Sequence, residues 1–225
     1  MEFRFFEIYR NPEYWLLLLE GAATSALLMI IAAFFAFLLA VGLAIVRHER
    51  ILILGWLAAA YVDFIRNTPL IVQLFFVAFG LPRLLDYAWP FWAHALLALT
   101  LNFSAYFSEI VRAGFRVSEG GQTEAAKSLG MSRYAIFKSI ILPQSIGRMY
   151  PSLNAQFVFL FLTTGIISEV SVRDLTYAGV FIDSRTFRSF EVFLTLTLMY
   201  LLLSLSFKST LTWMEQRLFP WKFVR

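Results

Sequence analysis

Residues 22–46 form an uninterrupted run of 25 residues without a charged side chain. A helix of about 20 apolar residues is long enough to cross the hydrocarbon core of a bilayer. Lipid offers no partner to backbone amides, so only helices and closed barrels can cross it, and barrel strands would alternate polar and apolar residues. The run therefore predicts a transmembrane helix. It begins after some twenty mixed residues with no basic segment or cleavage site, so we interpret it as a retained anchor rather than a signal peptide.

The rest of the chain extends this prediction, because 60% of its 225 residues are hydrophobic and only 15% are charged. We expect an all-α membrane protein with five transmembrane helices in a single domain, residues 1–225. Pro69 should kink the second span, because proline lacks a helical donor and clashes with the preceding turn. The expected spans are residues 22–46, 55–80, 91–111, 150–167 and 190–207.

Lys and Arg residues between the spans predict the orientation, since cytoplasmic loops carry an excess of them. Twelve lie in one set of alternating segments, residues 47–50, 112–148 and 208–225. Six lie in the other set, residues 1–20, 81–90 and 168–189. This bias predicts an outside N-terminus, a cytoplasmic C-terminus and a cytoplasmic loop 112–148.

Residue types that carry most bond chemistry are scarce. The chain has no cysteine, and its two histidines, His48 and His94, lie far apart in the sequence without ligand-like neighbours. We therefore predict no metal site, no catalytic residues and no cofactor in this chain. A Gly-x-x-x-x-Gly-Lys-Ser/Thr phosphate loop is also missing from the sequence.

The loop 112–148 contains the stretch EAAKSLGMSRYAIFKSIILP. It resembles the EAA signature of the permease subunits of ATP-binding-cassette (ABC) importers. The matching residues are Glu124, Ala125, Ala126, Gly130, Ile140, Leu142 and Pro143.

The residues of this stretch also predict its local structure. Glu124 near a helix start complements the helix dipole, and Gly130 permits a left-handed turn. A second short helix should begin at Ser132, a plausible cap, and end before Pro143. The resemblance implies that the two short helices are a coupling element that docks into a separate ATPase, which binds ATP and magnesium. The alternative is an amphipathic helix pair that lies on the membrane without a partner.

A second stretch, residues 66–76, reads RNTPLIVQLFF and resembles the R-G-T-P-L-L-V-Q-L segment of polar-amino-acid permeases, with Asn67 in place of glycine. Asn67, Thr68 and Gln73 offer polar groups beside a helix break at membrane depth, where transporters build binding sites. The alternative is that Pro69 is only a bend.

The chain departs from that family after Pro151. The family usually has a Lys-Asp-Thr-Ser run there, whereas this chain has Leu-Thr-Thr-Gly at residues 162–165. Glu169 follows, where an apolar residue is expected. Its carboxylate is a candidate for binding a substrate ammonium. Equally, it could pair with Arg173, one helical turn away.

The resemblance implies a type I ABC-importer permease for polar amino acids in the bacterial inner membrane. Its expected partners are cytoplasmic ABC ATPases, a second permease that is identical or paralogous, and a periplasmic or tethered binding protein. The main alternative is a permease for another small solute, such as an opine, peptide or organic ion. A membrane enzyme using Glu109 or Glu169 and a purely structural anchor are the alternatives from other classes.

Overall fold

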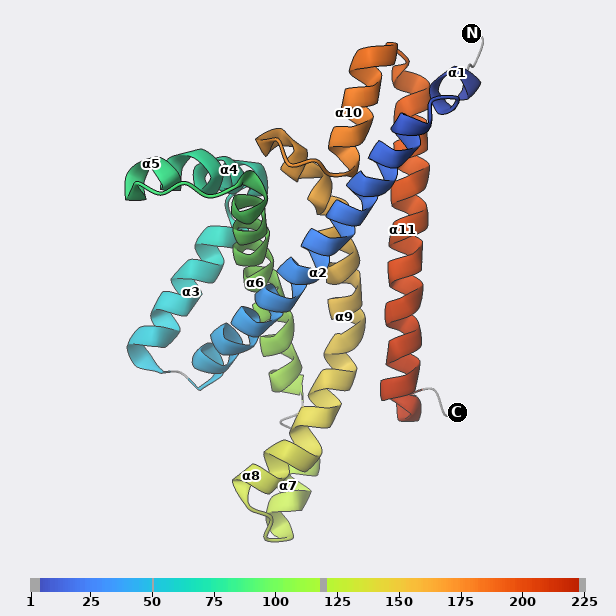
Figure 1. Cartoon of the computed structure of the whole chain (residues 1–225). Helices are drawn as coiled ribbons and strands as arrows, with labels where there is room; N and C mark the ends of the chain where they lie inside the picture. Colours follow the sequence, from blue (N-terminus) through green and yellow to red (C-terminus); the bar gives the residue numbers. More distant parts are fainter. Residues whose placement is uncertain (1–4, 50, 118–120, 223–225) are drawn as a thin grey trace. The chain divides into compact units, whose positions relative to one another are not determined.

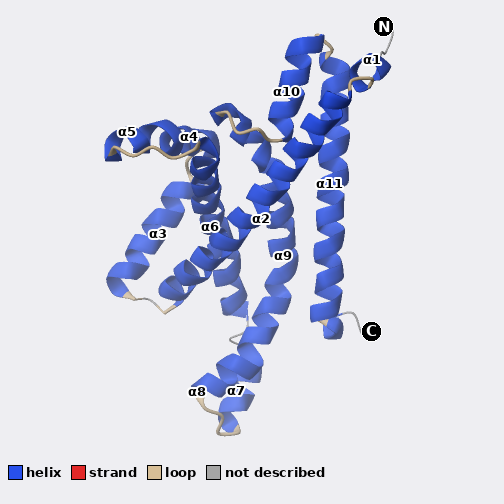
Figure 2. Cartoon of the chain, viewed as in Figure 1, coloured by secondary structure: helices blue, strands red, loops and turns tan. Residues whose placement is uncertain are grey.

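The computed structural model describes residues 5–49, 51–117 and 121–222. Within these ranges the chain is built of helices and loops, with no strand (Figure 2). The prediction of an all-helical protein is confirmed.

Four long helices account for about half of the chain (Figure 1). They are α2 (Pro12–His48), α6 (Phe91–Val117), α9 (Leu142–Thr163) and α11 (Ser189–Leu218). Shorter α-helices connect them: α1 (Phe5–Tyr9), α3 (Leu52–Arg66), α4 (Leu70–Phe75), α5 (Leu81–Leu85), α7 (Gly121–Ser128), α8 (Arg133–Ile136) and α10 (Leu175–Thr186). The remaining turns are the π-helices η1 (Phe76–Gly80) and η2 (Phe137–Ile141) and the 3-10 helices η3 (Thr164–Val170) and η4 (Pro220–Lys222).

Three continuous helical stretches in the described chain are long and apolar enough to cross a membrane: Pro12–His48, Arg133–Val170 and Ser189–Leu218. A fourth candidate is the broken pair Leu52–Arg66 and Leu70–Leu85. The expected span at residues 91–111 lies in α6, whose polar residues, among them His94 and Asn102, keep it outside this set. Length and composition thus support three or four spans, and the fifth stays a prediction.

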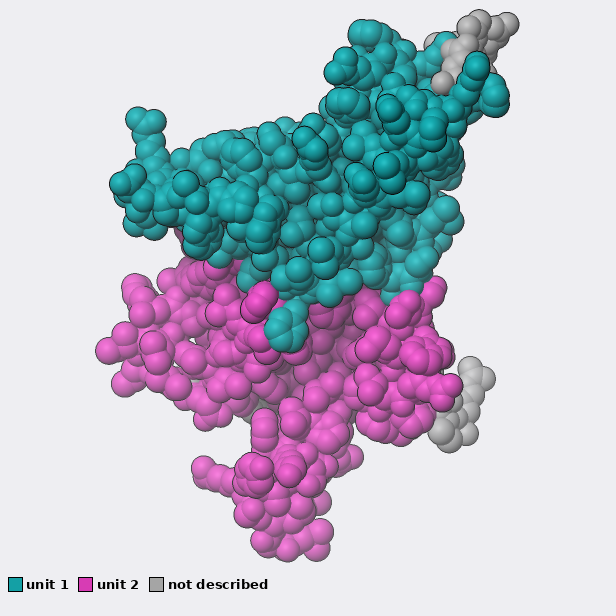
Figure 3. Space-filling view, in the orientation of Figure 1, with its two compact units in different colours: residues 1–34, 68–100, 158–207 teal, residues 35–67, 101–157, 208–225 magenta. Residues whose placement is uncertain are grey.

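The chain divides into two compact units, coloured separately in Figure 3. Unit 1 comprises residues 1–34, 68–100 and 158–207. Unit 2 comprises residues 35–67, 101–157 and 208–225. The prediction of one permease domain spanning the whole chain stays a prediction, and each unit is described on its own below.

The core of unit 1 is formed by α1, the first part of α2, α10 and α11. Glycine allows the closest approaches: a Cβ on Gly21 would lie 2.6 Å from the Asp174 carbonyl oxygen, and one on Gly179 would lie 2.1 Å from Leu196 Cδ1. Seven buried side chains fill the space between the helices: Ile8, Leu18, Leu175, Ala178, Ile182, Val192 and Leu196.

In unit 2, alanine residues allow the helices to approach closely. Ala36, Ala40 and Ala44 lie four residues apart on α2 and are fully buried, so they form one small-residue face that lets neighbouring backbones approach. On α3 and α6, Val62 and Ile65 pack with Ala105 in a second buried cluster.

Two predictions about prolines were wrong. Pro69 does not kink a helix: α3 ends at Arg66, and Pro69 has an extended ψ of 136° as the residue before α4. The reason is that the residue before a proline avoids the helical region. Pro143 does not end the helix that follows Ser132, because the helical stretch runs on from Arg133 to Val170.

A π-turn lets the helix continue through Pro143. The amide of Leu142 bonds to the carbonyl of Phe137, five residues back, in η2. In an ordinary α-turn the proline ring clashes with the carbonyl four residues earlier, and proline has no amide hydrogen to donate to it. The wider π-turn accommodates both effects. The same arrangement precedes Pro82, where the Leu81 amide bonds to the Phe76 carbonyl in η1. Part of the expected connection 81–90 is therefore helical.

The close approach at Gly21 yields a stability test. We expect Gly21→Ala to lower the thermal stability of the purified protein, because its methyl group would meet backbone atoms that cannot move aside. The matched control is Gly42→Ala on the same helix, where no atom lies within 4 Å of the added Cβ. This change should be neutral or stabilising by up to about 1 kcal/mol. Equal melting temperatures for the two variants would contradict the packing described for α2.

Candidate functional site

The signature in loop 112–148 folds into two short helices joined by a left-handed turn. Gly130 has a φ of +75°, as predicted for this position. The Met131 amide donates to the Ala126 carbonyl at 3.1 Å and the Gly130 amide to the Lys127 carbonyl at 3.0 Å. This pair of bonds is a Schellman motif, in which glycine adopts the left-handed position without strain.

Ser132 begins the second short helix. Its hydroxyl oxygen accepts a hydrogen bond from the Ala135 amide at 3.2 Å, which confirms the predicted cap. Ala126 of α7 and Ile136 of α8 are both 3% exposed, so the two helices hide one apolar residue each. Figure 1 shows α7 and α8 next to the start of α9.

The outer surface of this helix pair exposes two large hydrophobic side chains. Leu129 is 82% exposed and Tyr134 is 72% exposed, and both flank the Gly130 turn. Glu124 and Ala125 are exposed on α7. Exposed leucine and tyrosine side chains beside a rigid turn are typical of a surface that a partner covers.

The other part of the signature lies where this loop joins the long helix. Ile140 belongs to η2, and Leu142 and Pro143 open α9. A side-chain hydrogen bond from Gln144 to Gln122 ties the first turn of α9 to α7. The signature therefore combines a helix-pair turn with the entry of a membrane-spanning stretch.

Thr68 and Gln73, two of the residues predicted for the translocation path, contact each other in unit 1. The Gln73 amide donates to the Thr68 hydroxyl at 2.6 Å and to the Thr68 carbonyl at 3.2 Å. Asn67 falls in unit 2, where its side chain donates to the Asp63 carbonyl at 2.7 Å and its backbone caps α3. Asn67 thus has a local structural role.

Glu169 lies on η3, which contacts α4, the helix that carries Gln73. Its side chain is exposed. Among the described residues it forms no ion pair with Arg173, which is also exposed. The structure therefore brings the segments of Thr68, Gln73 and Glu169 together and does not show the alternative pairing.

Asp174 anchors the segment that follows Glu169. It is fully buried, and its carboxylate accepts from the Tyr177 amide at 2.8 Å to cap α10. The adjacent Leu175 amide donates to the Ser25 hydroxyl at 3.2 Å. Burial raises the pKa of the Asp174 carboxyl to about 6, more than its hydrogen bonds lower it. This residue lies between the candidate spans and was not predicted from the sequence.

Glu109 is the centre of an ion-pair cluster in unit 2. Its carboxylate pairs with Arg47 of α2, and with Arg112 of α6 at 2.6 Å. Arg66 of α3 lies 4.0 Å away and places its guanidinium over the Tyr106 ring at 5.6 Å. One carboxylate thus joins three helices beside three guanidinium groups. Only the Glu109 and Arg112 spacing of three residues signals this cluster in the sequence, because its other partners are distant along the chain.

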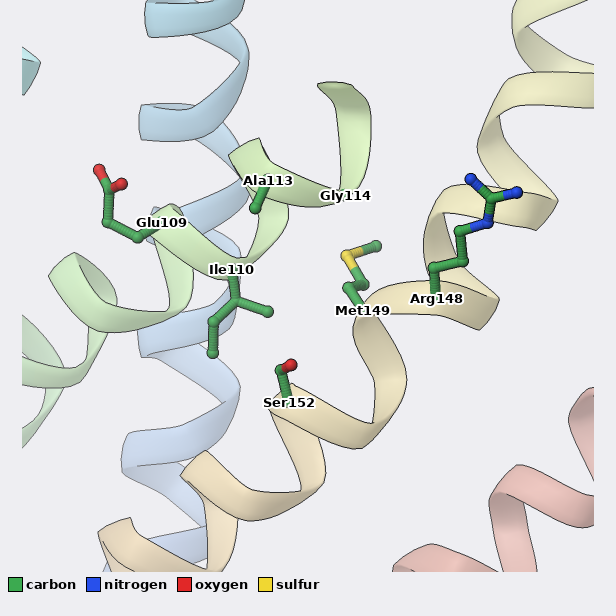
Figure 4. A pocket seen from close by; sticks show the side chains of 7 residues that line it. All are labelled: Glu109, Ile110, Ala113, Gly114, Arg148, Met149 and Ser152. Atoms are coloured by element: carbon green, nitrogen blue, oxygen red, sulfur yellow. The ribbon is translucent and has the colours of Figure 1, made fainter. Parts of the chain in front are cut away.

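A cavity of about 400 Å³ lies beside Glu109, between α6 and α9 (Figure 4). Its lining residues are Glu109, Ile110, Ala113, Gly114, Arg148, Met149 and Ser152. In Figure 4 the Glu109 carboxylate points away from the Met149 side chain. The described residues also hold no cluster of three metal-ligating side chains.

Residues 36–220 match the family of binding-protein-dependent transport system inner membrane components. The chain belongs to this family. It is 32% identical over 212 residues to an octopine transport system permease protein of Rhizobium radiobacter, covering 90% of this chain and 86% of that one. It is 36% identical over 200 residues to a probable glutamine ABC transporter permease protein of Bacillus subtilis (strain 168), covering 89% and 92%.

Solved structures agree with the family. An amino acid ABC transporter crystallised with histidines matches with a TM-score of 0.88 and 30% identity, covering 96% of this chain and 100% of that one. The MetNI methionine ABC transporter matches in fold, with a TM-score of 0.76, 15% identity and coverage of 92% and 98%. The permease is therefore a multi-pass membrane protein and a transport subunit. In keeping with this, the Glu109 carboxylate of the permease is engaged by arginines instead of being free for acid-base chemistry.

Asp174 gives the permease a testable pH dependence. Its pKa of about 6 in the fold exceeds the ordinary value of 3.8, so the folded state binds this proton more tightly than the unfolded state. The contribution of this carboxyl to stability is fully present below about pH 4 and is lost as the pH rises through about 6. Asn can keep the cap without titrating. We expect the melting temperature of Asp174→Asn, relative to wild type, to rise between pH 5 and pH 7.5.

Thermal unfolding of the detergent-solubilised permease at several pH values measures this difference. Asp174→Ala is the control, because it also removes the cap: relative to Asp174→Asn it should lose about 1 kcal/mol at every pH, since neither variant titrates at this position. A constant difference between wild type and Asp174→Asn across this range would show that Asp174 does not titrate there.

Proposed function

We propose that the chain is the transmembrane permease subunit of an ATP-driven importer for polar amino acids and that loop 112–148 couples it to a separate ATPase. The capped helix pair carries the proposal, since it exposes Leu129 and Tyr134 beside a defined turn at the position of the EAA signature. The similarity to an amino acid transporter over 96% of the chain supports the substrate class.

The partners follow from the chain's own chemistry and its family. The sequence has no phosphate-binding loop, so ATP and magnesium are bound by cytoplasmic ABC ATPases. The family description supports delivery of substrate by a binding protein. A second permease, identical or paralogous, completes the translocation path, which runs between the helices of the two permease subunits.

Two observations support five spans, an outside N-terminus and a cytoplasmic C-terminus. The basic residues favour this orientation twelve to six. The segments expected on the cytoplasmic side all belong to unit 2, and those expected outside all belong to unit 1. In this topology α6 is the third span, and its polar residues His94, Asn102, Ser104 and Ser108 are buried within the protein.

Thr68, Gln73 and Glu169 are proposed to line the translocation path, with Asn67 holding the helix break beside them. Glu169 is the only one of the four that carries a charge. It is exposed on a segment fixed by the buried Asp174 cap, which suits a carboxylate that receives a substrate ammonium.

An opine is the second candidate substrate, because octopine and nopaline transport permeases are also relatives at 32% identity. The amino acid proposal is preferred on the solved structure and on the glutamine and arginine permeases among the relatives.

Gly130→Asp tests the coupling surface. At a φ of +75° a side chain strains the backbone, and nothing within the chain lies within 4 Å of the added Cβ. The change should therefore leave membrane insertion intact while the turn distorts and a charge enters the partner's contact. We expect uptake to fall at least about tenfold, which corresponds to roughly 1.4 kcal/mol.

Uptake and ATPase copurification are measured together for this variant. Gly121→Asp is the matched control, because the space around its Cβ is also open and its φ is not left-handed. Wild-type uptake by Gly130→Asp, with normal copurification of the ATPase, would refute the coupling role.

Glu169→Gln tests substrate recognition. The amide keeps the shape and loses the charge, so uptake of cationic amino acids should weaken more than that of neutral ones. A lost charge-assisted hydrogen bond costs about 1.5 to 3 kcal/mol, or roughly ten- to a hundredfold in affinity.

Arg173→Gln and the double variant are the controls, since a direct Glu169 and Arg173 pair would give non-additive losses for all substrates alike. Equal transport of every substrate by Glu169→Gln would end the recognition hypothesis and leave Thr68 and Gln73 as the candidates.

A further inference from the structure

Pro151 lies inside α9 and has no amide hydrogen to donate. In an α-helix that hydrogen would go to the carbonyl four residues earlier, which is that of Gly147. A buried carbonyl without a partner is unfavourable, so the Gly147 oxygen needs another donor.

Lys222 supplies this donor. Its ammonium lies 2.7 Å from the Gly147 carbonyl oxygen and also pairs with the Glu215 carboxylate at the end of α11. Glu215 is only 8% exposed, and Lys222 lies beside the Phe219 ring, 6.0 Å from its centroid. An ammonium has three donors, so one lysine can serve both oxygens.

The absence of a side chain at Gly147 makes room for this contact. A Cβ there would already be in van der Waals contact with Phe219 at 3.6 Å and with Lys222 at 3.8 Å. Any longer side chain would displace the residues 219–222, which we call the C-terminal clasp. A cavity of about 380 Å³ lies beside the clasp and is bordered by Gln122, Gln144 and Arg148.

The same part of α9 also holds the loop that carries the signature. Gln144 lies three residues before Gly147, on the same side of the helix, and bonds to Gln122 of α7. The first turns of α9 are therefore attached to α7 through Gln144 and to α11 through Lys222. This stretch of α9 thus connects α7 with the end of α11.

We propose that Lys222 is a positioning residue for coupling: by capping the carbonyl that Pro151 leaves open, it ties the end of α11 to the coupling loop. The proposal rests on the proposed function of loop 112–148. Without the clasp the ATPase still binds the loop, but its movement is passed to the spans less completely.

The central experiment is a double-mutant cycle between Lys222→Met and Pro151→Ala. Alanine at position 151 restores the amide donor to the Gly147 carbonyl, so Lys222 becomes dispensable for that bond. Transport per ATP hydrolysed is measured in proteoliposomes that contain the permease with its ATPase and binding protein. Lys222→Met should lower this ratio at least about threefold in the wild-type background and much less in the Pro151→Ala background.

Lys208→Met is the matched control, since Lys208 is exposed on α11 and lies outside the clasp. Lys222→Arg keeps a charged donor and should restore most of the ratio, which separates positioning from a general loss of structure. If Pro151→Ala fails to fold, this rescue decides the question alone. A ratio for Lys222→Met equal to that of Lys208→Met, or an equal loss in both backgrounds, would overturn the proposal.

Thermal unfolding of the four proteins of the cycle, which are the wild type, the two single variants and the double variant, distinguishes this proposal from the proposed function. Melting temperatures should show the same coupling between positions 151 and 222 even in permease that has no ATPase bound. If the temperatures couple but wild-type proteoliposomes do not transport amino acids, the proposed function fails and the capping bond stands. Additive temperature changes would show that the bond itself is wrong.

Discussion

Every backbone carbonyl and amide of a membrane protein needs a partner within the protein, because hydrocarbon supplies none. Prolines make this requirement visible, and the chain meets it in three ways. At Pro69 the helix stops and a new one begins. Before Pro82 and Pro143 a π-turn shifts the hydrogen-bonding pattern by one residue. At Pro151 the helix continues, and the open carbonyl of Gly147 is satisfied by Lys222. The irregular positions at Pro69, Pro143 and Pro151 coincide with segments proposed to act in transport or coupling.

Two of the carboxylates likewise have partners within the protein. Glu109 is shared among arginines of three helices, so the charge of this carboxylate is compensated. Asp174 instead keeps its carboxyl in a fully buried site by capping a helix. Glu169 has neither arrangement, since it is exposed and forms no ion pair with Arg173 in the described chain. That contrast is the physical reason for proposing it as the group that meets a substrate charge.

Local signals in the sequence predicted the parts of the structure that depend on local chemistry. The left-handed Gly130 and the Ser132 cap are set by residues within one turn of each other, and both are confirmed. The effects of Pro69 and Pro143 were predicted wrongly. At Pro69 a helix break competes with a kink, and at Pro143 a π-turn competes with a helix end, each at similar local free-energy cost. The Arg47–Glu109 and Gly147–Lys222 contacts join residues 62 and 75 positions apart, so no local pattern predicts them.

The chain has no cysteine, so a single introduced thiol reports on one position. The most direct test of the account places it at Leu129, on the exposed turn of the coupling loop, or at Leu84, which is 72% exposed on α5. A linker with one thiol-reactive and one photoreactive end is then applied to membranes that hold the whole transporter. The account predicts that Leu129→Cys is cross-linked to the ATPase, whereas Leu84→Cys is not and reacts with a membrane-impermeant thiol reagent on intact cells. Cross-linking of the ATPase to Leu84→Cys and not to Leu129→Cys would contradict both the coupling surface and the orientation.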